Sequence, residues 1–418
     1  MKSLINWLDY SEEDQRRVRE MLQLFSNTGT VDDLGIGTVR DAISNALFPG
    51  TSVIQTRARY FLFIPWLFQR AERDYPQRLI AKATDMERNL VEALRVGGDL
   101  EGLIGREAGK NVRTLPSAIF WGGLIRYGIF LVPSLSITQY GRQVGRGISA
   151  ADTEDEIGDR LPSFWQREVP DPPRDFFHFR SATFELARDE AEWLCERIVS
   201  SDRPYKQPSM LTACIRDIRR GNAPLAVNAI WDAELPADTA APIVRLVYHA
   251  QQLSCAAQGA ALLYNLILAE ERSKTIESAE STSPATYSLQ IDKWIADAIR
   301  LHLAKWAVRT DEFWSCLLDF GAAIPPSTRL FIDDWSKLIA ADPGRIASSP
   351  RARELIRARE LQHKRGQARL INKERLTAWT GYAGTTPLSF RWPQVQRMLR
   401  DIGAGLGSHV VGADDAVA

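Results

Sequence analysis

A long uncharged stretch, from Leu246 to Ala269, limits the fold more than any other feature of the sequence. Its length would allow a helix to cross a membrane. Four amide side chains interrupt it, however, and each would lose its hydrogen bonds to water inside a lipid bilayer: Gln251, Gln252, Gln258 and Asn265. The stretch therefore predicts a helix over 241–271 that is buried inside a protein rather than a membrane span.

The rest of the chain has the same helical character. Apolar residues recur at spacings of three and four, and no pair of alternating strands is visible. After a first helix that follows Ser11, the pattern predicts helices over 40–47, 54–75, 78–96, 117–130, 181–199, 209–220, 291–307, 311–320, 328–340, 350–363, 372–379 and 393–402. The 12 tryptophans are spread along the chain, which is typical of core positions between helices. The predicted fold class is all-α, with few or no strands.

Composition changes between 151 and 178, where a run of acidic residues is followed by several prolines. Such a stretch is typical of a linker or a long surface loop. The sequence therefore predicts an N-terminal helical domain over 1–150, a linker or long loop over 151–178 and a C-terminal helical domain over 179–405. The glycine-containing end, 406–418, is predicted to be a flexible tail.

The charge balance and the cysteine content limit the kinds of partner and the cellular compartment that we expect for this protein. The chain has 52 basic and 52 acidic residues, which excludes a uniformly basic coat but allows a local basic face. The four cysteines are too far apart for a CxxC pair, and their apolar surroundings predict buried thiols in a reducing compartment. The first residues turn acidic too early for a secretion signal. We therefore expect a cytoplasmic protein.

Familiar catalytic patterns are absent from the sequence. The nearest match to a phosphate-binding P-loop, GREAGKN at 105–111, is one residue short, and Asn111 stands where a hydroxyl is needed to bind magnesium. The five histidines are scattered, and neither HExxH nor GxSxG occurs. The sequence therefore favours a non-catalytic protein with no cofactor and no metal. An enzyme with an unfamiliar site stays open as an alternative.

The first candidate site lies in PGTSVIQTRARYFLFIPW, residues 49–66. Thr51 or Ser52 can cap a helix that follows the Pro-Gly turn, and the start of a helix carries free N–H groups and a partial positive charge. Arg57 and Arg59 would add two guanidinium groups about one turn into that helix. These four residues predict a site for an anion such as phosphate.

A structural role is the alternative for the same arginines. Arg57 or Arg59 could pair with Asp32, Asp33 or Asp41 and hold two helices together. Buried arginines usually have an internal partner, so this alternative is favoured over phosphate binding.

The second candidate site is a basic segment at 350–375, in which nine basic residues stand against three glutamates. Ser349 followed by Pro350 predicts the start of a helix, and Gly366 predicts its end. Two helices with a basic surface could follow the phosphates of DNA or RNA. The predicted contacts are Arg351, Arg353, Arg357, Arg359, Lys364, Arg365, Arg369, Lys373 and Arg375. The alternative is an ordinary solvated face, paired with the acidic residues at 152–159.

Three motifs resemble an uncharacterised bacterial family, a domain of unknown function, whose members have a similar length. They are WLDYSEED at 7–14, LGIGTVRDA at 34–42 and LFPGTSVIQTRARYFLFIPW at 47–66. The resemblance implies a bacterial cytoplasmic setting. It also implies genes in mobile or defence-type clusters, beside helicase-like and nuclease-like genes. It implies no activity and no catalytic residue.

Together these features predict a non-catalytic, nucleic-acid-associated or adaptor component of a bacterial defence or mobile-element system. DNA and RNA are both open as partners. The alternative is a protein scaffold whose helix faces dock a helicase-like or nuclease-like partner.

Overall fold

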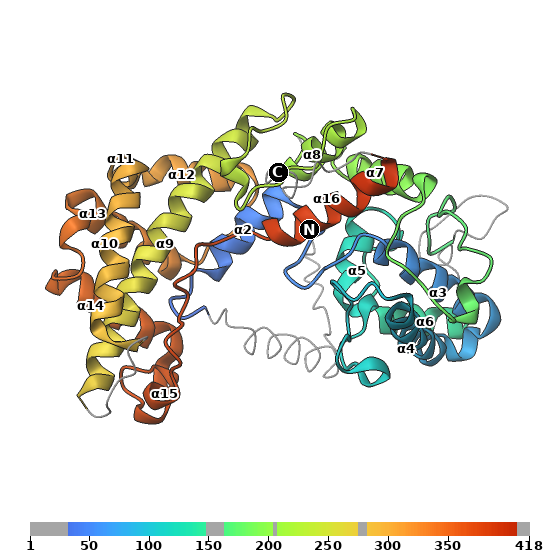
Figure 1. Cartoon of the computed structure of the whole chain (residues 1–418), viewed down its shortest axis with the longest axis horizontal. Coiled ribbons are helices and arrows are strands. Elements are labelled where there is room, and N and C mark those ends of the chain that lie inside the picture. The colour runs from blue at the N-terminus through green and yellow to red at the C-terminus, as the bar shows by residue number, and fades with distance from the viewer. Residues whose placement is uncertain (1–31, 148–162, 204–206, 275–281, 408–418) are drawn as a thin grey trace, which may run out of the picture. The chain divides into compact units, whose positions relative to one another are not determined.

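The computed structural model describes most of the chain, namely residues 32–147, 163–203, 207–274 and 282–407. These residues form fifteen α-helices and several short 3-10 helices, and they contain no β-strand (Figure 1). An isolated antiparallel bridge joins Phe130 to Trp165. The predicted all-α fold is confirmed.

Three predicted features lie outside the described residues: the helix after Ser11, the motif at 7–14 and nearly all of the tail at 406–418. Most of the acidic part of the predicted linker also lies outside them. Pairing between the basic segment and these acidic residues therefore stays a prediction.

The chain divides into two compact units. Of the described residues, the first unit takes 32–42 and Tyr248–Leu388, and the second takes Ile43–Val247 and the chain from Ser389 onward. Each unit is therefore discontinuous in sequence. This division does not follow the predicted boundary at 151–178, because the residues on both sides of that range belong to the second unit.

The second unit is built around α3 (Tyr60–Asp74). Every residue of α3 from Tyr60 to Phe68 is buried, which accounts for the aromatic run in the sequence. The helix continues through Pro65. The other helices of the second unit are α4 (Leu79–Gly97), α5 (Pro116–Arg126), α6 (Ile137–Gly145), α7 (Arg188–Ser201), α8 (Met210–Arg219) and α16 (Trp392–Leu406).

Part of the predicted linker packs into the second unit. Trp165 lies against Phe130, with 5.0 Å between ring centroids. The indole N–H of Trp66 on α3 donates to the carbonyl oxygen of Pro170 over 2.6 Å. Phe176 stacks on another α3 ring, Phe63, at 5.5 Å. The described part of the segment, 163–178, is therefore a loop whose buried rings, Phe164, Trp165 and Phe176, add to the core of the second unit.

The first unit contains α9 (Ala241–Ser273), which begins just before the unit boundary, and the helices that pack beside it (Figure 1). These are α10 (Pro284–Arg300), α11 (Leu303–Ala307), α12 (Thr310–Asp319), α13 (Pro326–Ala341), α14 (Pro350–Lys364) and α15 (Lys373–Thr377). The short helix α2 (Gly37–Leu47) starts in the first unit and ends in the second.

Tryptophans attach the surrounding helices to α9. The indole N–H of Trp294 donates to the carbonyl oxygen of Cys255, and that of Trp335 donates to Ala256, both over 2.8 Å. A Cβ atom on Gly259 would lie 2.3 Å from the Trp294 ring, so the glycine allows this close approach. The predicted role of these tryptophans as core residues is therefore confirmed.

The amide side chains of α9 also have partners in the first unit. Asn265 donates to the carbonyl oxygen of Ala383 over 2.9 Å, and Gln258 donates to that of Thr385 over 3.2 Å. Among the described helices, α9 is long and apolar enough to cross a membrane, but its apolar window is 94% buried inside the protein. The predicted buried helix is confirmed.

Candidate nucleic-acid interface

Arg57 lies among acidic groups of the second unit. Its Nε donates to Asp401 on α16 over 3.0 Å, and its Nη1 donates to Asp99 over 2.9 Å. The same Nη1 also donates to the carbonyl oxygen of Glu101 over 2.9 Å. The backbone N–H of Ala58 donates to Asp401 as well. Two carboxylates therefore already balance the charge of this guanidinium.

Arg59 is buried and paired with a single carboxylate. Its Nη2 donates to Glu190 over 2.8 Å, and its Nη1 donates to the carbonyl oxygen of Thr183 over 3.0 Å. Glu190 also accepts from the backbone N–H of Ala187, which is how it caps α7. The guanidinium therefore connects the start of α3 to the start of α7, with both charges removed from solvent.

Thr51 and Ser52 do not cap a helix. The Thr51 hydroxyl donates to the carbonyl oxygen of Phe48 over 2.6 Å. The backbone N–H of Ser52 donates to the side chain of Gln55 over 3.2 Å. Helix α3 begins at Tyr60, later than predicted, and has no side-chain cap. The predicted anion site at a capped helix start is therefore not formed by these residues.

Arg57 and Arg59 both have the structural role that was the alternative to phosphate binding. Their partners, however, are not the predicted Asp32, Asp33 or Asp41. Asp32 accepts from the first backbone N–H groups of α2. Asp33 bonds to the basic segment, and Asp41 pairs with its sequence neighbour. Arg57 and Arg59 instead use acidic residues distant in sequence to hold elements of the second unit together.

The basic segment forms two helices joined by a tight turn, as predicted. The Ser349 hydroxyl accepts from the backbone N–H of Ala352 over 3.2 Å, and Pro350 occupies the first helical position. After α14 the chain makes a 3-10 turn at Arg365–Gln367 and then enters α15. The nine basic side chains divide into five that point inward and four that remain outside.

Arg353 and Arg357 bind the end of α9. The Arg353 guanidinium makes two bonds to Glu270, over 2.6 and 2.8 Å. Arg357 lies 3.5 Å from Glu271. These pairs attach α14 to α9 within the first unit, so both arginines serve the fold.

Arg359 is buried and holds the LGIG motif. Its guanidinium donates to the carbonyl oxygens of Leu34 and Gly35 over 2.7 and 3.0 Å, and to the hydroxyl of Thr328 over 3.0 Å. Burial lowers the pKa of Arg359. Gly35 has a φ of +65°, and a Cβ there would lie 2.6 Å from the guanidinium. The glycine therefore permits both the turn and the contact.

Lys364 and Arg369 converge on Asp33, which is 5% exposed. Lys364 and Arg369 both contact the same carboxylate oxygen, with Arg369 at 2.7 Å. Burial, and then repulsion from Arg369 and Arg375, lowers the pKa of Lys364 to about 7. Burial is the larger cause, because removing the ammonium group from water disfavours its charged form, and the nearby guanidinium groups add to the effect.

Glu360 fixes the turn after α14. It is fully buried and accepts from the backbone N–H groups of Arg369 and Leu370 over 2.7 and 3.2 Å. The hydroxyl of Tyr264 on α9 also bonds to it. The carboxylate is therefore satisfied by three donors, and it sets the direction in which the chain leaves α14.

Four basic side chains of the segment are exposed and make no ion pair with any residue that the structure describes: Arg351, Arg365, Lys373 and Arg375. Two glutamates of the segment, Glu354 and Glu374, are exposed as well. The free positive charge is therefore smaller than the sequence count suggests, and it lies at the two ends of α14 and on α15.

The acidic partners of Arg57 and Arg59 were not predicted from the sequence, although a local sequence pattern marks one of them. Glu190 stands at the third position of α7, where a capping carboxylate is common. Ser136 and Gln139 form a complete capping box at the start of α6, which was not predicted. By contrast, nothing near Asp99 or Asp401 indicates an arginine partner.

No group of three or more metal-ligating side chains occurs in the described part of the chain. The four cysteines are buried. The chain is thus an all-α protein of two discontinuous units, with a small exposed basic face on the first.

A family model described as a family of unknown function (DUF6361) matches residues 2–405. The chain belongs to this family, because the match covers nearly its whole length. This confirms the resemblance to an uncharacterised domain family that the motifs indicated. No curated protein and no solved structure matches the chain.

Proposed function

We propose that the protein is a non-catalytic, nucleic-acid-associated component of a bacterial defence or mobile-element system. The outer face of α14 and α15 would contact the phosphates of DNA or RNA. The exposed positions of Arg351, Arg365, Lys373 and Arg375 support this proposal, because unpaired cations can replace the counterions of a nucleic acid. The bacterial defence setting is supported by the motif resemblance.

The division of the basic residues into paired and exposed side chains predicts how strongly binding should depend on salt. Five of the nine cations hold the first unit together, so four remain for phosphate contacts. Four contacts correspond to a slope of log K against log salt of about −4 for duplex DNA and about −3 for a single strand. A protein that used all nine would show roughly twice that slope.

The test is a fluorescence anisotropy titration of labelled single-stranded and duplex oligonucleotides at several salt concentrations. A variant with Arg351, Arg365, Lys373 and Arg375 each changed to Glu should bind much more weakly at low salt. The matched control changes four other exposed basic residues to Glu: Arg106, Lys110, Lys293 and Lys305. The control should bind nearly as the unmodified protein does. Absence of binding by the unmodified protein, or equal loss in both variants, would contradict the proposal.

A second proposal is docking of a protein partner by the first unit. Large apolar side chains are exposed on its helices: Ile299 (63%), Val308 (70%), Leu318 (72%) and Leu330 (62%). Exposed apolar area of this kind is typical of interaction surfaces where it is contiguous. A tagged protein that copurifies with a neighbouring gene product after nuclease treatment would support docking. Loss of the partner on nuclease treatment would favour the nucleic-acid proposal instead.

A further inference from the structure

A second group of unpaired cations lies in the second unit, where α6 crosses the turn between α3 and α4. This turn is the 3-10 helix η1 (Pro76–Arg78). A Cβ atom on Gly141 would lie 2.3 Å from Ile80, and one on Gly145 would lie 3.6 Å from the carbonyl oxygen of Pro76. Gly141 therefore allows α6 to lie directly against the first turn of α4, whereas a Cβ on Gly145 would make only an ordinary contact with η1.

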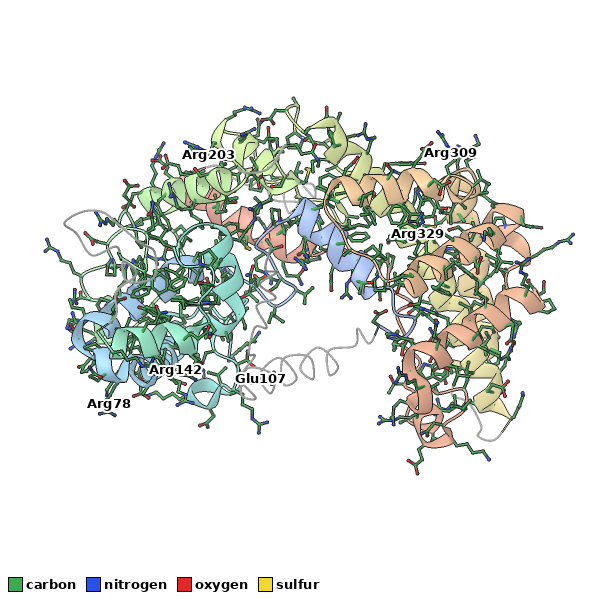
Figure 2. The ribbon with its side chains drawn as sticks, turned by 180° about the vertical axis from the view of Figure 1, so that it is seen from behind. Arg78, Glu107, Arg142, Arg203, Arg309 and Arg329 are labelled. Atoms are coloured by element: carbon green, nitrogen blue, oxygen red, sulfur yellow. The ribbon has the colours of Figure 1, made fainter. Side chains whose placement is uncertain are left out.

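Three arginines gather at this contact. Arg142 and Arg146 each follow one of these glycines, and they lie on the same side of α6 because they are four residues apart. Arg78 ends η1, and Figure 2 shows Arg78 and Arg142 at the same end of the second unit. All three side chains are exposed, and none pairs with a carboxylate in the described part of the chain.

The nearby carboxylates are already engaged. Asp74 pairs with both Arg70 and Arg73. Glu72 bonds to the hydroxyl of Tyr140 on α6 and points into the protein. Among the described residues, these acidic groups therefore do not neutralise the three arginines, and this part of the surface has an excess of positive charge.

An exposed aromatic ring accompanies the cations. Tyr75 immediately precedes η1 and is 44% exposed. The Lys82 ammonium lies 5.5 Å from the centre of its ring, so the lysine belongs to the same surface. It also lies 4.0 Å from the exposed carboxylate of Asp85, so it adds less free charge than the arginines do. Cations beside an exposed ring are the groups with which proteins bind single strands, through phosphate pairing and base stacking.

We propose that Tyr75, Arg78, Lys82, Arg142 and Arg146, here called the η1–α6 surface, bind single-stranded nucleic acid. This deepens the proposed function and rests on it, because it adds a second contact on the other unit. The exposed ring favours a single strand over a duplex, whose stacked bases are not available to it. No large exposed aliphatic residue lies in η1 or α6, whereas a membrane-binding surface would insert such residues into lipid.

The charge contribution is tested with an oligothymidine of about 15 nucleotides, which suits a site of this kind. Changing Arg78, Arg142 and Arg146 to Glu should weaken binding and make the salt slope shallower by about 2, because three single-strand phosphate contacts are lost. The matched control changes Arg106, Lys110 and Arg113 to Glu. These residues are exposed and follow α4 in the sequence, outside η1 and α6. The control should leave the slope unchanged.

The stacking contribution has a different signature. Tyr75→Ala should weaken oligothymidine binding roughly fivefold or more, the usual effect of losing one stacked base. The salt slope should stay the same, because no charge is removed. Tyr75→Phe keeps the ring and should bind as the unmodified protein does. Circular dichroism should give the same spectrum for all three proteins.

The outcomes separate this inference from the proposed function. If the unmodified protein binds no oligonucleotide, both are wrong. If α14–α15 variants lose binding while the Arg78, Arg142 and Arg146 variant does not, the η1–α6 surface is excluded and the proposed function stands. Equal weakening by the matched control also overturns the inference. Binding to phosphatidylserine vesicles, lost in the arginine variant, together with unchanged oligothymidine binding, would assign the surface to lipid instead.

Discussion

Arg57 and Asp401 lie 3.0 Å apart, although 344 residues separate them in the sequence. The contact joins the chain just before α3 to the last helix, α16. Asp401 also accepts from the backbone N–H of Ala58, so one carboxylate satisfies two donors of the same segment. The helix at the C-terminal end of the described chain is therefore an internal part of the second unit.

Asp401→Asn should destabilise the protein by about 2 kcal/mol, because the amide leaves part of the buried Arg57 charge unbalanced. The measurement is urea unfolding followed by tryptophan fluorescence. The matched control is Glu101→Gln, which removes a 67% exposed carboxylate paired with Arg397. That change should cost less than about 1 kcal/mol. Equal effects of the two changes would contradict the structural role given to Asp401.

Glu87→Gln should flatten the pH dependence of stability. Glu87 on α4 is buried and accepts from the backbone N–H and the hydroxyl of Ser117, over 2.7 and 2.8 Å. Burial raises the pKa of Glu87 to about 7 from 4.5. The folded protein thus keeps a proton that the unfolded chain releases, and stability falls as the pH rises from about 4.5 to 7.

The size of this effect can be measured by urea unfolding at pH 5 and pH 8. A shift of this size corresponds to as much as about 3 kcal/mol between the two conditions. The glutamine variant cannot ionise, so its stability should change less over the same interval. Parallel stability curves for the two proteins would show that Glu87 titrates normally in the folded state.

Gly35→Ala should destabilise the first unit more than Gly98→Ala destabilises the second. Both glycines have positive φ, +65° and +83°, so alanine costs about 1–2 kcal/mol at either position. A Cβ on Gly98 meets nothing within 4 Å, whereas one on Gly35 would collide with Arg359. Thermal unfolding of both variants measures the difference. Equal shifts in Tm would mean that the contact with Arg359 contributes little.

Arg351→Glu should affect nucleic-acid binding and Arg353→Glu should affect stability, although both residues lie in the first turn of α14. Arg351 is exposed and unpaired in the described chain, so its reversal should weaken nucleic-acid binding and leave stability within about 0.5 kcal/mol. Arg353 holds Glu270, so its reversal should destabilise the first unit by about 2 kcal/mol. Anisotropy and urea unfolding on the same two proteins test both statements. Weaker binding in Arg353→Glu alone would contradict the assignment.

The cysteines should not react with a thiol reagent in the native protein. Burial raises the pKa of Cys195, Cys214 and Cys255 to about 12, so almost no thiolate is present at neutral pH. Cys316 is buried as well. A colorimetric disulfide reagent should therefore report no free thiol under native conditions and all four in urea. Rapid reaction of any cysteine in the folded protein would contradict this burial.

Helices with one strongly apolar face were predictable from the sequence, because their period needs no distant information. The predicted helix over 241–271 agrees closely with α9, and that over 350–363 agrees with α14. The stretch before Tyr60 was predicted as helix and is instead a turn. There the Gln55 side chain bonds the backbone of Ser52 and Gly50, which is a local competition that a periodic pattern does not reveal.

The candidate site was less predictable, because exposure depends on partners far along the chain. Arg353 and Arg351 look equivalent in the sequence, yet Arg353 has Glu270 as a partner and Arg351 has none in the described chain. The η1–α6 surface was missed for the same reason. Its arginines come from segments far apart in the sequence, and glycine contacts between helices bring them together.

The discontinuity of both units has a consequence for biosynthesis. The segment at 32–36 can form its contacts only after Arg359 and Lys364 have been synthesised. The segment around Arg57 can form its own only after Asp401 has been synthesised. A ribosome must therefore release almost the entire chain before either unit can reach its final contacts. Early helices would remain exposed to chaperones during translation, and a prematurely terminated product would lack both finished units.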